Sequence, residues 1–156
     1  MRLDYVSLNQ TLFSRLMALE TALRESDLDS SLVNLLKVRA SQINGCLFCT
    51  DMHLKEAVLS GEEKLKLFHL NHWHESKLFS DREKSALYWL EALTEAGKSG
   101  ASDEAFDNLK QYFDDEEIVD MTYVISMINF WNRLGLAFKP DPGSLDEMYG
   151  LNKAVI

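Results

Sequence analysis

The chain has 156 residues, 46% of them hydrophobic, which is enough to build one sizeable core. It carries 25 acidic and 16 basic side chains, a formal net charge of -9, and the resulting field repels phosphate backbones and anionic lipid surfaces. These values argue against nucleic acid and membranes as partners. The first 13 residues show no signal or targeting pattern, so we expect one cytoplasmic domain over residues 1–156.

The spacing of apolar residues in the first half predicts helices and no strands, as in an all-α protein. Residues 8–23 repeat apolar side chains every three or four positions, which predicts a helix that packs across the others. Asp29 can cap a second helix that runs to Ile43, where Asn44 and Gly45 interrupt it. A third helix is expected from Cys46 to Gly61.

Capping signals continue through the second half and bring the expected total to about six to seven helices in one bundle. The expected caps and ends, in chain order, are the Ser80–Glu83 capping box, Gly97, Ser102, and the Asp114–Glu117 capping box. The last helix, 118–134, has few polar residues on any side, so we expect it in the core and against another subunit. The segment 139–143 holds both prolines and predicts an irregular tail that reaches a neighbouring subunit.

The only two cysteines form one Cys-x-x-Cys motif, which excludes a framework of several disulfides and favours redox or metal chemistry. Cys46 and Cys49 are three residues apart, and His53 follows Cys49 by four. On a helix these spacings bring all three side chains to one face. The motif is therefore the strongest candidate for a reactive site.

Thiolate is the reactive form of cysteine, and both a helix N-terminus and a nearby imidazolium favour it. Cys49 has both neighbours, so we assign it the attack on a hydroperoxide, with His53 giving a proton to the departing oxygen. Cys46 then closes a disulfide with the oxidised Cys49. An outside dithiol must reduce that disulfide, which requires one sulfur to be reachable from solvent.

Two other interpretations of the cysteine motif, and one of the histidines, compete with this one. The motif could be half of a zinc site, but no second pair of ligands completes four, or the cysteines could be buried and inert. His69, His72 and His74 fit a helix end and loop better than a metal site, because no carboxylate or cysteine stands at a helpful spacing. We therefore expect neither a metal nor another cofactor.

Residues 35–46, followed by Cys49, Asp51, Met52 and His53, closely resemble the AhpD-like alkylhydroperoxidases of the carboxymuconolactone decarboxylase superfamily. The resemblance continues through residues 80–83 with Ala86 and Leu87, and through 128–129 and 131–134. It covers most of the chain after about Asp29, which makes it specific. It implies an all-helical fold that assembles as trimers or hexamers, with the cysteine motif near subunit contacts.

The resemblance implies the same roles as the spacing: Cys49 attacks, Cys46 resolves, and His53 belongs to a proton relay. The best-studied relatives are re-reduced by a lipoyl-bearing protein, which the resemblance implies as a partner. Members of the family often carry a relay glutamate twelve positions before the first cysteine, but here that position is Asn34, an amide that cannot take up a proton. Glu56, three residues after His53, is the candidate substitute, although the sequence favours its interpretation as a solvated helix residue.

Together these features predict an antioxidant thiol peroxidase that reduces alkyl hydroperoxides through a Cys46–Cys49 disulfide. Because Asn34 replaces the relay glutamate, a protein disulfide reductase with little peroxide activity is an alternative function. A second alternative is a non-enzymatic redox sensor whose disulfide alters the assembly of subunits. Lactone decarboxylation is disfavoured, because a redox-active cysteine pair serves no evident step in it.

Overall fold

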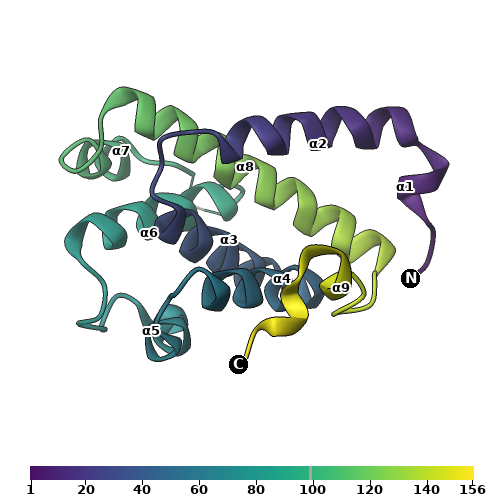
Figure 1. Cartoon of the computed structure of the whole chain (residues 1–156). Coiled ribbons are helices and arrows are strands. Elements are labelled where there is room, and N and C mark those ends of the chain that lie inside the picture. The colour runs from purple at the N-terminus through teal and green to yellow at the C-terminus, as the bar shows by residue number, and fades with distance from the viewer. Residues whose placement is uncertain (99) are drawn as a thin grey trace.

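The computed structural model describes residues 1–98 and 100–156, and within them every regular element is a helix, as the apolar spacing predicts (Figure 1). The elements are α1 (Tyr5–Leu8), α2 (Gln10–Arg24), α3 (Ser30–Asn44), α4 (Leu47–Leu59), α5 (Lys64–His69), the 3-10 helix η1 (Leu70–His72), α6 (Asp81–Thr94), α7 (Asp103–Leu109), α8 (Asp115–Phe138), α9 (Asp146–Tyr149) and the 3-10 helix η2 (Leu151–Lys153). The described residues thus form nine α-helices where about six to seven were expected. The excess is explained by α1 and α9, which have only four residues each and too little length to show an apolar period.

Helix α3 lies at the centre of the bundle and packs against α4, α6 and α8 (Figure 1). Its Leu35 and Leu36 are fully buried and belong to one core with Leu87 and Leu90 of α6 and Ile128 of α8. Burying side chains of this size contributes roughly 1.5–3 kcal/mol each. The C-terminus of α3 leads directly into the cysteine motif, so the core fixes the place where that motif begins.

The helix ends follow the sequence signals closely. Side-chain caps are present at Asp29, Ser80, Ser102 and Asp114, and α6 and α8 both show complete capping boxes. Gly45 ends α3 with a φ of 68°, a left-handed backbone conformation that residues other than glycine rarely adopt. This turn lets α4 start immediately afterwards.

The expected helix at 8–23 differs from the structure at its start and in its packing. Asn9 has non-helical backbone angles and caps α2 by accepting a hydrogen bond from the Leu12 amide, so α1 is a separate turn. Helix α2 runs along α8 and leaves much of its apolar stripe uncovered, with Leu12 67% and Leu19 45% exposed. Glu20 is instead the buried residue of this helix.

Helix α8 extends four residues beyond the predicted end at position 134 and stops at Lys139, which adopts a left-handed conformation just before Pro140. After the irregular segment the chain folds back on itself. The 3-10 helix η2 packs against α4, and Lys55 holds Asp146 at 2.7 Å. Within residues 1–98 and 100–156, no helix has both the length and the apolar character needed to cross a membrane.

Candidate active site

The cysteine motif opens α4. Cys46 is the N-cap residue, with its Sγ accepting a hydrogen bond of 3.3 Å from the Cys49 amide, and Cys49 lies in the first turn. The two sulfurs form a disulfide bond. The prediction that both cysteines lie at a helix start, near the positive end of its dipole, is confirmed.

Both cysteines are buried in this disulfide form, with Cys46 2% and Cys49 4% exposed. The expectation that one sulfur is reachable from solvent is therefore wrong for this state. The reason is the close approach of α8, whose Gly135 has no side chain to hold the helix away. A Cβ built at Gly135 would lie 2.6 Å from the sulfur of Cys46 and 3.1 Å from that of Cys49.

His53 is also buried, at 8% exposure, and its Nδ1 lies 2.6 Å from the Oε2 atom of Glu56 one turn further along α4. Glu56 is thus a partner of the imidazole, and the reading as a merely solvated residue is wrong. Burial by itself raises the pKa of Glu56, but the hydrogen bond and the positive charges around it outweigh burial and hold the pKa below its ordinary value.

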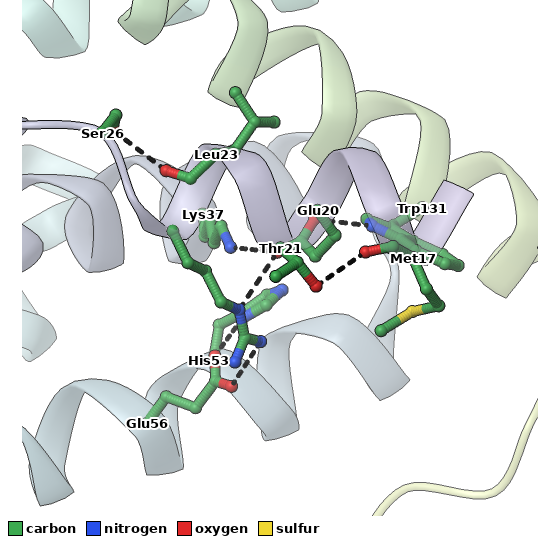
Figure 2. A network of polar contacts seen from close by, with 10 residues as sticks. Met17, Glu20, Thr21, Leu23, Ser26, Lys37, His53, Glu56 and Trp131 are labelled. Atoms are coloured by element: carbon green, nitrogen blue, oxygen red, sulfur yellow. Dashed lines mark hydrogen bonds and ion pairs between the residues drawn. The ribbon is translucent and has the colours of Figure 1, made fainter. Parts of the chain in front are cut away.

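A buried carboxylate, that of Glu20, lies beside this pair (Figure 2). Glu20 of α2 binds Lys37 of α3 at 2.7 Å and accepts a hydrogen bond of 3.0 Å from the Trp131 indole of α8. Arg24 lies between the two carboxylates, 3.7 Å from Glu20 and 3.9 Å from Glu56. Burial pushes the pKa of Glu20 upward, but Lys37, Trp131 and Arg24 bring it below its ordinary value.

Sequence reasoning missed Glu20, Lys37 and Arg24. The one available signal is a glutamate within the apolar stripe of residues 8–23, which indicates a buried charge that needs a partner. The sequence does not show which residue is the partner of Glu20, because Lys37 lies 17 positions away on another helix.

Asn34, at the position of the family's relay glutamate, lines a cavity of about 380 Å³ together with Glu56. The cavity lies between α2, α3, α4, α8 and the C-terminal segment. Neither cysteine nor His53 is among its lining residues. Within the described part of the chain no hydrogen bond joins Asn34 to His53, so Asn34 does not orient the imidazole in this state.

A buried amide network fixes the turn before Cys46. The Asn44 side chain donates to the side-chain oxygens of Asn129 and Asn132 of α8, both at 2.9 Å. Asn132, which is fully buried, donates in turn to the hydroxyl of Ser41 at 3.0 Å. These bonds tie the end of α3 to α8 on the same side as the disulfide.

The three clustered histidines lie at the end of α5 and in η1 and the loop after it, as the sequence predicts. His69 is hydrogen-bonded to the Ser76 hydroxyl at 3.1 Å, and His74 stacks on Trp73. Among the described residues no three side chains of the metal-binding types lie close enough together to hold an ion.

Comparison with known proteins gives the class to which this fold and site belong. Residues 10–92 match the model of the carboxymuconolactone decarboxylase family, and the chain belongs to that family as an AhpD-like member. It is 32% identical over 136 residues to the uncharacterized protein YdfG of Bacillus subtilis, a match that covers 87% of this chain and 92% of YdfG.

Two solved structures share the fold. The first is ATU0492 from Agrobacterium tumefaciens, a protein of unknown function described as a candidate antioxidant defence protein AhpD, with 38% identity, a TM-score of 0.88, and coverage of 90% of this chain and 97% of that one. The second is an uncharacterized peroxidase-related protein from Ralstonia eutropha with an alkylhydroperoxidase AhpD core, similar at 17% identity and a TM-score of 0.79 over 89% of this chain and 74% of that one. At 17% identity the second likeness shows the fold alone.

Proposed function

We propose that this protein is a thiol peroxidase that reduces organic hydroperoxides through Cys46 and Cys49. The observation that carries the proposal is a Cys46–Cys49 disulfide at the start of α4, followed by His53 bound to the carboxylate of Glu56. A helix N-terminus and a carboxylate-supported imidazolium both favour a thiolate at Cys49.

In the proposed cycle the Cys49 thiolate attacks the outer oxygen of the hydroperoxide and the O–O bond breaks. The departing alkoxide takes a proton from the His53 imidazolium and leaves as an alcohol, while Cys49 becomes a sulfenic acid. The Cys46 sulfur then attacks the Cys49 sulfur and the hydroxide leaves as water after protonation. A dithiol reduces the disulfide through a mixed disulfide and is itself oxidised, so one hydroperoxide and one dithiol give alcohol, water and a new disulfide.

Burial of the sulfurs supports a small substrate. A hydroperoxide needs only a narrow path to reach Cys49, whereas the disulfide of a folded protein is too bulky to approach cysteines that are only 2% and 4% exposed. The same argument favours a slender dithiol as the reductant, such as a lipoyl group carried on an arm. A protein disulfide reductase and a redox sensor are therefore the weaker candidates.

We further propose that the protein works as a homo-oligomer. Large apolar side chains are exposed along α2 and α8, including Leu12, Leu19, Tyr123 and Phe130. Clusters of this kind on two adjacent helices are typical of surfaces that another chain covers.

The test is to treat the reduced protein briefly with cumene hydroperoxide and to locate the oxidised sulfur by mass spectrometry. We expect a Cys46–Cys49 disulfide in the wild type, a trapped sulfenate on Cys49 in Cys46→Ser, and no peroxide consumption in Cys49→Ser. Peroxide consumption by Cys49→Ser at the wild-type rate would overturn the proposal. Parallel assays with insulin disulfides and light scattering on oxidation separate the reductase and sensor alternatives.

A further inference from the structure

Glu56 is the residue that links the buried imidazole to the surface cavity. Its Oε2 atom lies 2.6 Å from Nδ1 of His53, and the same side chain lines the cavity of about 380 Å³, which His53 does not reach. The Glu56 side chain is 21% exposed and that of His53 10%. A proton on His53 therefore has Glu56 as its neighbour on the path to solvent.

The charges that face Glu56 come from three helices. His53 lies on α4 itself, Arg24 on α2 stands 3.9 Å away, and Lys37 on α3 adds a further positive charge. Glu20 on α2 is the nearby negative group, and its charge is already balanced by Lys37 at 2.7 Å. Tyr149, from α9, also lines the cavity. The surroundings thus favour an ionised Glu56.

Asn34 lines the same cavity from α3. Since an amide takes up no proton, position 34 contributes no relay group in this chain. The cavity nevertheless holds a carboxylate that touches the imidazole, contributed by α4.

We propose that Glu56 is the proton-relay residue of this protein, passing protons between His53 and solvent through the cavity lined by Asn34 and Glu56. The proposal rests on the proposed function for its place in a peroxidase cycle. The Glu56 bond occupies Nδ1 and leaves Nε2 for proton exchange with the Cys49 sulfur. When the Cys49 thiol loses its proton to His53, the Glu56 carboxylate stabilises the imidazolium, and the proton later returns to the alkoxide or leaves through the cavity.

The test measures how easily the Cys49 thiolate forms and does not depend on peroxidase activity. In the Cys46→Ser background the rate of Cys49 alkylation by iodoacetamide is measured against pH. Glu56→Gln keeps an oxygen that accepts the Nδ1 hydrogen bond but removes the charge. We expect the midpoint of the pH profile to rise by about one unit, so that alkylation well below the midpoint slows roughly tenfold.

Asp51→Asn is the matched control, because it removes one negative charge from the same helix at a similar exposure but pairs with Lys55 and not with His53. We expect its profile to coincide with that of the parent. Glu56→Asp should fall between the two, and Asn34→Glu added to Glu56→Gln should restore part of the shift by placing a carboxylate in the same cavity. Circular dichroism checks that each variant folds.

An unshifted profile in Glu56→Gln and in Glu56→Asp, or an equal shift in Asp51→Asn, would overturn the relay. Its failure is distinct from failure of the proposed function. If Glu56→Gln shifts the profile but the wild type consumes no hydroperoxide, the relay is supported and the peroxidase proposal is wrong. If Cys49 carries peroxide reduction and no profile shifts, the relay alone is wrong.

Discussion

The backbone of Gly135 lies against the sulfur of Cys46, so close that a Cβ at position 135 would come within 2.6 Å of it. Because real Cβ atoms do not approach sulfur at such a distance, the separation of α8 from the start of α4 depends on a glycine at this position. The same contact hides both sulfurs from solvent.

Gly135→Ala should destabilise the disulfide form by about 1–3 kcal/mol, because the added methyl group overpacks the contact and this cost exceeds the helix propensity gained. Urea unfolding of the oxidised protein measures the change. Gly97→Ala is the control, since a Cβ there meets nothing within 4 Å. In the Cys46→Ala background, which lacks both the disulfide and the sulfur nearest to position 135, Gly135→Ala should cost less, and an equal cost in both backgrounds would show that positions 46 and 135 do not touch.

Asn132→Ala should cost about 2 kcal/mol, because it removes two buried side-chain hydrogen bonds, one from the Asn44 amide and one to the Ser41 hydroxyl. The same variant should loosen the turn before Cys46. We expect faster reduction of the disulfide by dithiothreitol in addition to the loss of stability. Asn152→Ala on the exposed side of η2 should change neither quantity.

Local signals sufficed to predict the helices that frame the site. Asp29, Gly45 and Ser80 act through neighbours within a few positions, so capping chemistry alone places the ends of α3 and α6 and the start of α4. The Cys46 and Cys49 positions follow from the same local geometry.

The remainder of the site depends on contacts between distant segments. Glu20 meets Lys37 across 17 positions and Trp131 across 111, and Gly135 reaches Cys46 from another helix. A single sequence carries no record of such pairings. Burial of the sulfurs could not be predicted for this reason, since it is caused by the approach of α8 and not by the motif.

Glu20→Gln should destabilise the protein by about 3 kcal/mol at neutral pH, because it leaves Lys37 as a buried charge without its partner. Removing the other partner by Lys37→Met leaves Glu20 with only Arg24, at 3.7 Å, as a positive neighbour and should also destabilise the protein. Combining the two changes should cost less than their sum, since no unpaired charge remains. Equal costs for the double variant and the summed single variants would show that the pair is not coupled.

The free energy of unfolding should also fall in acid, because two carboxylates have a lowered pKa in the folded protein. Glu20 and Glu56 both have a pKa below the ordinary value of 4.5, so their contribution is fully present above about pH 4.5 and is lost as the pH falls through the lowered values. Urea unfolding between pH 6 and pH 3 measures the loss. In Glu20→Gln the slope in this range should be shallower, and an unchanged slope would remove Glu20 as a source of the dependence.

Reduction of the disulfide requires an opening motion, because neither cysteine exceeds 4% exposure in the oxidised form. A dithiol attacks only the molecules in which the start of α4 has moved away from Gly135, so the reduction rate should follow the population of that open form. Low urea concentrations, below the unfolding transition, should therefore accelerate reduction by dithiothreitol, while a short Cys-x-x-Cys peptide shows no such effect. Gly135→Ala should react faster than the wild type without urea and respond less to it. A rate independent of urea in the wild type would mean that a sulfur is already accessible.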